Sequence, residues 1–183
     1  GRILIDGKDI HNYSLADLRR NVGIVQQDVF LFSGNIKDNI ALNNDELSDE
    51  EIIQVAKYVN ADKFISKLPN GYNEPVMERG ATLSTGQRQL IAFARVLAYN
   101  PSIFILDEAT SNIDTETELL IQDALNKIIK DRTSIIIAHR LSTIQNVDRI
   151  LVLHKGEIVE EGSHFELLDK QGLYYDLYRL QYT

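Results

Sequence analysis

The chain has 183 residues, of which 19 are lysine or arginine and 27 are aspartate or glutamate, so its formal net charge is −8. This acidic balance, without a basic block, argues against a nucleic-acid backbone as the main partner. Because there is no cysteine, neither a disulfide nor a thiolate metal site holds the chain together. No run approaches the roughly 18 to 20 apolar residues that cross a bilayer, and charges interrupt the first ten residues, so we expect a soluble chain without a signal peptide.

The N-terminal part predicts two strands joined by a short helix. Residues 3–5, ILI, place two isoleucines on one strand face and end at an Asp-Gly turn. This pattern is typical of half a β-hairpin, whose partner strand we place before the start of the printed chain. Ser14 with Asp17 forms an N-cap pattern for a short helix. The sequence VGIV at residues 22–25 predicts the second strand.

A loop and a helical region follow the second strand. The loop carries Gln27, Phe30 and Phe32, which from the residues alone are a polar loop residue and two satellite core side chains. Residues 35–68 predict helices, because a capping box at Ser48 precedes apolar residues at helical spacing.

The stretch from Ser84 contains a helix start with a glycine in it. Ser84 and Gln87 form a capping box, so Ser84 is expected to N-cap the helix. The apolar positions of this helix recur at the spacing of one helical face: Leu90, Phe93, Ala94 and Leu97. A helix N-terminus offers unpaired N–H groups and a positive dipole end, which suits a phosphate. Gly86 has no side chain, so a phosphate can approach the backbone closely.

An apolar run then leads to two adjacent carboxylates. Residues 103–106, IFIL, show no alternation and predict a strand buried on both faces, as in a parallel sheet. Asp107 and Glu108 follow at its carboxyl end, where open α/β sheets bind ligands. In phosphoryl transfer an acid there can hold Mg²⁺ while its neighbour orients the attacking water. The plainer interpretation is a solvated loop.

The C-terminal part repeats the pattern of a strand that ends in a polar side chain. Asp114 or Thr115 can cap a long helix, and the strand at residues 134–138 ends at His139. A lone histidine is most often structural, but His139 can face the same crevice as Glu108. Two further strands and two helices are predicted after it. We interpret the remaining histidines as surface residues: His11, His154 and His164.

Taken together, LSTGQ, DEAT and SNID resemble the signature, Walker B and D-loop motifs of ABC-type ATPases, while VQQDVFLFSGNI resembles their Q-loop and AHRLST their H-loop. The resemblance covers essentially the whole chain. It implies an α/β, P-loop NTPase-like fold with a mostly parallel core sheet and an inserted α-helical subdomain. Residues 1–34 would hold core strands and the Q-loop, residues 35–98 the helical subdomain with the signature, and residues 99–183 the Walker B, D-loop and H-loop.

The resemblance also implies a residue set for ATP hydrolysis. Asp107 would hold Mg²⁺ through water, and Glu108 would act as general base or orient the water. Gln27 and His139 would complete the site around the γ-phosphate, with Gln27 also contacting Mg²⁺.

The signature residues would serve a second ABC nucleotide-binding domain. In the implied sandwich, Ser84, Gly86 and Gln87 face the ATP that is bound mainly by the partner, and Asp114 lies at the dimer contact. Thr85 departs from the usual L-S-G-G-Q, which leaves both an identical and a non-identical partner open. The implied parent protein is an exporter that fuses transmembrane domains to the ATPase and works at the cytoplasmic face of the cell membrane, without nucleic acid.

The sequence contains no phosphate-cradling loop of the form G-x-x-x-x-G-K-[ST]. We therefore interpret the chain as the C-terminal portion of such a domain and expect the 183 residues alone to bind Mg-ATP weakly and to turn it over little. A non-catalytic interaction module stays open as an alternative on this ground. A soluble ABC ATPase of DNA repair or chromosome maintenance is a second alternative, which the short stretch between Gln27 and Ser84 disfavours.

Overall fold

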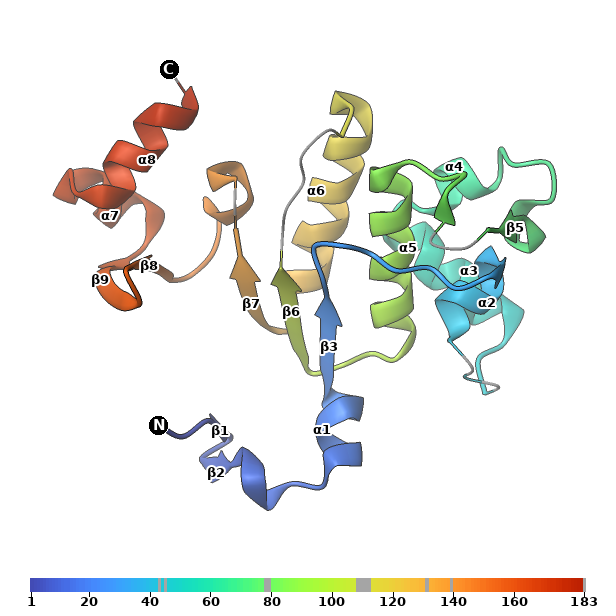
Figure 1. The fold of residues 1–183 in the computed structure, drawn as a ribbon, viewed down its shortest axis with the longest axis horizontal. Coiled ribbons are helices and arrows are strands. Elements are labelled where there is room, and N and C mark those ends of the chain that lie inside the picture. The colour runs from blue at the N-terminus through green and yellow to red at the C-terminus, as the bar shows by residue number, and fades with distance from the viewer. Residues whose placement is uncertain are drawn as a thin grey trace. The chain divides into compact units, whose positions relative to one another are not determined.

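The computed structural model describes residues 1–42, 44, 46–77, 80–107, 113–130, 132–138 and 140–182. The chain divides into two compact units, residues 1–135 and residues 136–183. Strands and helices alternate along the first unit, which confirms the predicted α/β class (Figure 1). Among the described residues, no helix combines the length and apolar character needed to span a bilayer.

A sheet with strand order β3-β6-β7 carries the predicted loop and the strand that ends in Asp107. Its strands are β3 (Val22–Val25), β6 (Ile103–Asp107) and β7 (Thr133–Ile137). Strands β3 and β6 are parallel, with Val25 opposite Leu106. Because the two strands run in the same direction, Gln27 and Asp107 follow at the same edge of the sheet.

Helix α5 (Thr85–Ala98) lies at the centre of the first unit's core. It packs against α2, α3, α6 and β3, and its Phe93 ring meets the Phe104 ring of β6 edge to face, with centroids 6.3 Å apart. The other helices of this region are α2 (Ile36–Ala41), α3 (Asp49–Tyr58), α4 (Asp62–Ile65) and α6 (Thr115–Ile129). A short ladder of β4 (Gly34–Asn35) with β5 (Pro75–Val76) and the 3₁₀ turn η2 (Gly71–Asn73) complete it. The predicted helical character of residues 35–68 is confirmed.

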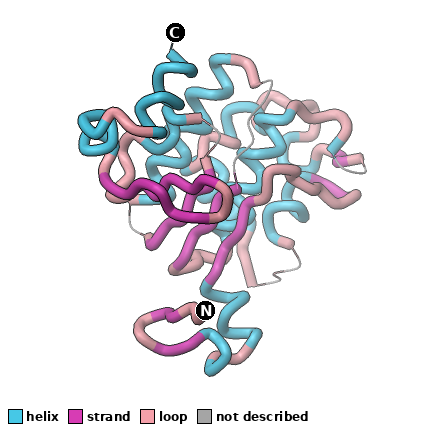
Figure 2. The backbone as a smooth tube through the Cα atoms, turned by 60° about the vertical axis from the view of Figure 1, so that its left-hand side comes forward, coloured by secondary structure: helices cyan, strands magenta, loops and turns pink. Residues whose placement is uncertain are grey.

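The N-terminal hairpin differs from its prediction. Strand β1 (Leu4–Ile5) pairs antiparallel with β2 (Lys8–Asp9), so the partner strand lies inside the chain and its predicted place before the chain was wrong. Asp6 and Gly7 both have positive φ, 50° and 76°, which matches the twist of a two-residue hairpin turn. The 3₁₀ turn η1 (Ile10–Asn12) and helix α1 (Leu15–Asn21) then lead into β3 (Figure 2).

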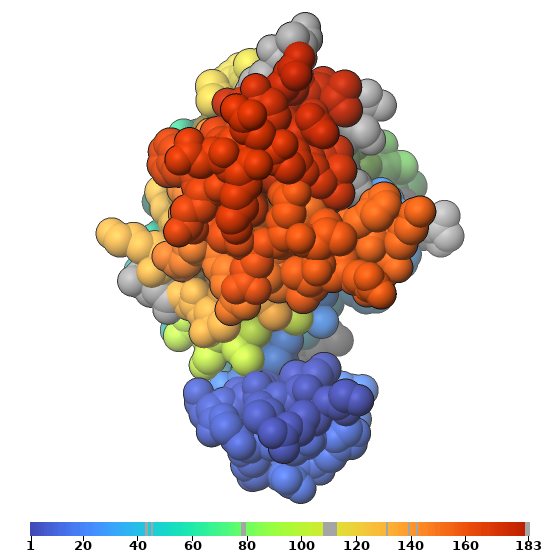
Figure 3. Space-filling view, turned by 90° about the vertical axis from the view of Figure 1, so that its left-hand side faces the viewer, coloured from blue at the N-terminus to red at the C-terminus, as the bar shows by residue number. Residues whose placement is uncertain are grey.

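The second unit is a hairpin packed against two helices, orange and red in Figure 3. Its elements are η4 (Leu141–Ile144), β8 (Ile150–His154), β9 (Glu157–Gly162), α7 (His164–Lys170) and α8 (Leu173–Tyr182). Its buried core gathers Leu141, Ile150, Val152, Leu167 and Tyr174. His164 is only 8% exposed, and its Nδ1 lies 2.7 Å from the Tyr174 hydroxyl, so its prediction as a surface residue was wrong. His11 and His154 are exposed, as predicted.

Replacing Gly23 with alanine is expected to destabilise the first unit by about 1–3 kcal/mol, the usual cost of overpacking. A Cβ on Gly23 would lie 2.5 Å from Val96 Cγ1 and 2.7 Å from Pro101 Cγ. Because the proline ring cannot rotate away, β3 must shift. Urea unfolding measures the change, with Gly1→Ala as the matched control, since nothing lies within 4 Å of that position. An unchanged free energy of unfolding for Gly23→Ala would contradict the expectation.

Candidate functional site

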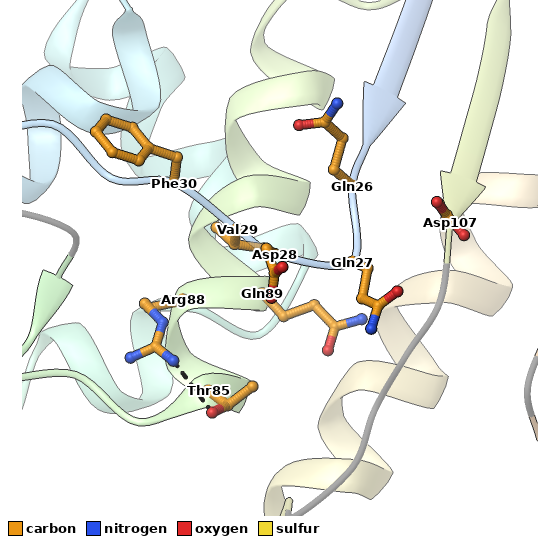
Figure 4. Close-up of a pocket in the computed structure, with 9 residues that line it drawn as sticks. All are labelled: Gln26, Gln27, Asp28, Val29, Phe30, Thr85, Arg88, Gln89 and Asp107. Carbon is orange, nitrogen blue, oxygen red and sulfur yellow. Dashed lines mark hydrogen bonds between the residues drawn. The ribbon is translucent and has the colours of Figure 1, made fainter.

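A pocket opens where β3 and β6 end. Its volume is about 450 Å³. It is lined by Gln26, Gln27, Asp28, Val29, Phe30, Thr85, Arg88, Gln89 and Asp107 (Figure 4). The parallel pairing of β3 with β6 brings the predicted residues Gln27 and Asp107 to one cavity, although nearly the whole helical region separates them in sequence.

The side chains of this pocket point in different directions. In Figure 4 the Gln27 amide extends to the same side as the Gln89 amide, whereas Gln26 points away from both. Asp107 lies at the end of β6 and is half-buried.

Asp107 and Gln27 fit a magnesium ion by their chemistry. A carboxylate and an amide carbonyl offer the oxygen atoms that Mg²⁺ prefers, and Mg²⁺ commonly takes one or two carboxylates together with water and phosphate oxygens. Within the described ranges, no three histidine, cysteine, aspartate or glutamate side chains come together as a metal cage. A metal here would therefore take part of its coordination from water and nucleotide.

The start of α5 is built as the capping box predicts. The Ser84 hydroxyl accepts a hydrogen bond from the Gln87 N–H at 3.2 Å, and the Gln87 side chain accepts one from the Ser84 N–H at 2.9 Å. The hydroxyl of Thr85 accepts a hydrogen bond from Arg88 at 3.1 Å, drawn as a dashed line in Figure 4. Arg88 also donates to the Leu83 carbonyl at 2.7 Å. Thr85, the residue that departs from L-S-G-G-Q, is thus hydrogen-bonded to the guanidinium of Arg88, about one helical turn later.

Gly86 has a packing role that the sequence did not indicate. It is buried, and a Cβ there would overlap the Thr117 methyl group of α6 and lie 3.3 Å from Ile113 Cγ2. The glycine therefore lets α5 approach the first turn of α6. Close approach of a phosphate to Gly86 stays a prediction.

Asp114 caps α6, the helix that Gly86 touches. Its side chain accepts a hydrogen bond from the Thr117 N–H at 2.9 Å, and this bond holds the pKa of the exposed Asp114 carboxyl below its usual value. The predicted general base Glu108 and the predicted γ-phosphate contact His139 lie outside the described residues. Their roles stay predictions.

Sequence reasoning missed two cavity-lining residues, Arg88 and Gln89. Both follow the helix start by about one turn, and Gln89 is buried. The available signal was the helix period: Arg88 and Gln89 follow Thr85, which lines the same cavity, by three and four positions and so share its face of the helix.

Comparison with known proteins identifies the family. A family model described as ABC transporter matches residues 1–111. A probable multidrug resistance ABC transporter ATP-binding/permease protein of Bacillus subtilis is 56% identical over 181 residues, which cover 99% of this chain and 27% of the relative. An ATP-dependent lipid A-core flippase of Syntrophus aciditrophicus is 53% identical over 182 residues, which cover 100% of this chain and 30% of the relative.

A solved structure gives the same assignment. The structure of a bacterial Atm1-family ABC exporter with ATP bound superimposes with a TM-score of 0.91 at 46% sequence identity, covering 100% of this chain and 32% of that one. The chain thus spans roughly a third or less of the length of these relatives, in the part that corresponds to an exporter's ATP-binding domain. On these grounds the chain belongs to the ABC transporter family.

Proposed function

We propose that this chain forms part of the ATPase of an ABC exporter and supplies residues that bind and hydrolyse ATP to drive export across the membrane. The observation that carries the proposal is the meeting of Gln27 and Asp107 in one cavity at the carboxyl ends of two adjacent parallel strands. Open α/β sheets bind their ligands at this edge. The name of the Bacillus subtilis relative, which joins ATP-binding and permease functions, supports the exporter over a soluble DNA-repair ATPase.

The proposed catalytic roles are those that the resemblance to ABC-type ATPases implies. Asp107 holds Mg²⁺ through water, and Gln27 contributes its amide oxygen at the same cavity. Glu108 accepts a proton from the attacking water or orients it, and His139 contacts the γ-phosphate. Mg²⁺ held by Asp107 and Gln27 would supply positive charge to the phosphates.

The proposed partner is a second ABC nucleotide-binding domain. Ser84, Gly86 and Gln87 face the nucleotide held mainly by that partner, and Asp114 lies at the contact between the two. The capping box supports this role because it fixes the N-terminus of α5, whose free N–H groups and dipole favour an anion. The second domain is either identical or a related subunit.

The helical region of residues 35–98 is proposed to contact transmembrane domains of the same transporter, at the cytoplasmic face of the cell membrane. Residues 1–34 and 99–183 then supply the core strands and the catalytic motifs. Hydrolysis opens the ATP sandwich and drives alternating access of the membrane domains.

Calorimetry of Mg-ATP binding tests the proposal. The 183 residues contain no G-x-x-x-x-G-K-[ST] loop, so we expect them to bind Mg-ATP at least about 100-fold more weakly than a longer polypeptide that carries such a loop, a difference of roughly 2.7 kcal/mol. The reason is that this loop supplies the backbone N–H groups and the lysine that hold the phosphates.

The longer polypeptide also provides the site-specific comparison. There Asp107→Asn is expected to remove the gain in affinity that Mg²⁺ provides, whereas Asp49→Asn, the same chemical change at an exposed carboxylate of α3, should leave that gain intact. Equal Mg-ATP affinity of the short and long polypeptides would contradict the proposed function, because another loop would then have to hold the phosphates.

A further inference from the structure

The segment that follows Gln27 is held in place by hydrogen bonds to one buried asparagine. Asn39 of α2 is only 1% exposed. Its Oδ1 accepts a hydrogen bond from the Phe32 N–H at 2.8 Å, and its Nδ2 donates to the Phe32 carbonyl at 2.8 Å and to the Asn35 carbonyl at 2.9 Å. The side chain thus satisfies both backbone groups of Phe32, much as a neighbouring strand would.

An arginine from α5 bonds both to this segment and to Asn39 itself. The Nε of Arg95 donates to the Asn39 carbonyl at 2.8 Å, and its two terminal nitrogens donate to the Phe30 carbonyl at 2.9 Å and to Asn39 Oδ1 at 3.1 Å. The fork geometry of the guanidinium allows one side chain to reach all three acceptors. Burial lowers the pKa of Arg95, and these bonds compensate part of its lost hydration.

This network supports two exposed aromatic rings. Phe30 and Phe32 are 46% and 52% exposed, with ring centroids 5.0 Å apart in an edge-to-face arrangement. The Arg95 guanidinium lies 5.9 Å from the Phe32 ring centroid. Leu31, which lies between the two phenylalanines in sequence, is fully buried. The two rings therefore form an exposed apolar pair, and the backbone that carries them is hydrogen-bonded to Asn39 and Arg95.

Only two residues, Asp28 and Val29, separate this fastened segment from Gln27. The three Cα–Cα steps from Gln27 to Phe30 span at most about 10 Å when extended, so the connection is short. Residues 27–30 all line the cavity that contains Asp107. A displacement of the aromatic pair is consequently transmitted to Gln27 as long as the network keeps residues 30–32 rigid.

We propose that Asn39 and Arg95 are positioning residues, because their hydrogen bonds hold the backbone of residues 30–32 in one conformation. A displacement of the Phe30–Phe32 pair then moves Gln27 and does not merely bend the loop between them. The inference rests on the proposed function, because it takes Gln27 to act at the ATP site and extends the proposed contact of the membrane domains from residues 35–98 to the adjoining Phe30–Phe32 pair. Neither residue touches the nucleotide in this assignment. Their effect passes entirely through the backbone of residues 27–32.

The test uses the full-length transporter that contains this chain, reconstituted in lipid nanodiscs. In Asn39→Ala and Arg95→Met, hydrogen exchange in the peptide covering residues 27–34 should accelerate at least about tenfold, because buried backbone groups lose their partners. ATPase kcat should fall by at least about fivefold while the KM for ATP changes less than about twofold, as expected for lost transition-state positioning. Arg95→Lys, which keeps the charge but not the fork, should lie between wild type and Arg95→Met.

The matched control is Tyr99→Phe. The Tyr99 hydroxyl lies within hydrogen-bond distance of the Ala41 and Leu42 carbonyls, at 3.0 and 2.9 Å, so it also joins the end of α5 to the end of α2, and neither of these bonds involves residues 30–32. This variant should lower the melting temperature without changing exchange in residues 27–34 or kcat. An equal loss of kcat in Tyr99→Phe, or an unchanged kcat in Arg95→Lys and Arg95→Met despite faster exchange, overturns the proposal. A different result would contradict the proposed function: ATPase activity that is unchanged in Glu108→Gln.

Discussion

Glu108→Gln in the full-length protein is expected to lower ATP turnover by about 10²–10⁴-fold, the range that a general base contributes, while Mg-ATP still binds. Glutamine has nearly the same shape as glutamate but cannot accept the proton of the attacking water at neutral pH. Phosphate release at saturating Mg-ATP measures turnover, and nucleotide affinity is measured on the same preparation.

Glu116→Gln provides the control for the loss of one carboxylate. Glu116 lies in the first turn of α6 and is exposed, so the same chemical change there should leave turnover unaltered. Turnover of Glu108→Gln within about threefold of wild type would remove Glu108 from the catalytic role, since such a factor is far below the contribution of a general base.

Gly86→Ala is expected to destabilise the first unit and to reduce ATPase activity. Helix propensity alone predicts the opposite sign, because alanine is better than glycine in a helix by up to about 1 kcal/mol. Overpacking costs about 1–3 kcal/mol, and the new Cβ would overlap the Thr117 methyl group at the contact between α5 and α6. We therefore expect a net loss of roughly 1–2 kcal/mol in the free energy of unfolding, measured by urea titration.

A second substitution checks the cause. Thr117→Ser removes the methyl group that the new Cβ would meet and keeps the hydroxyl. The double variant should regain most of the stability lost in Gly86→Ala, and any ATPase activity lost through displacement of α6 should return with it. If Gly86→Ala proved as stable as wild type, or if Thr117→Ser gave no recovery, the packing explanation of this glycine would fail.

Features set by neighbouring residues were predictable from the sequence. The capping boxes at Ser48, Ser84 and Ser163 all form both of their hydrogen bonds, because each depends on two side chains three positions apart. The N-terminal hairpin was misplaced although its Asp-Gly turn was recognised, since the polar pair Lys8–Asp9 does not look like a strand. His164 was misassigned because its burial depends on Tyr174, which reaches it from the next helix.

The candidate site likewise combines features that were predictable from the sequence with features that were not. The convergence of Gln27 and Asp107 was predictable from two strands that end in polar residues, because parallel strands share their carboxyl edge. The network of Asn39 and Arg95 was not, since the bonds of Arg95 join residues 56 to 65 positions apart. No local pattern marks which arginine of a helix will turn inward to meet backbone carbonyls.

The parallel pairing of β3 with β6 also has a consequence for the order of folding. β3 can find its partner only after the helical region between them has been synthesised. Closing so long a loop costs entropy before any strand pairing compensates it, whereas α2, α3 and α5 pack against one another within that region. Assembly is thus favoured to proceed from the helices to the sheet as the chain leaves the ribosome. A substitution in α2 or α5 can therefore lower the yield of folded protein without touching the ATP site.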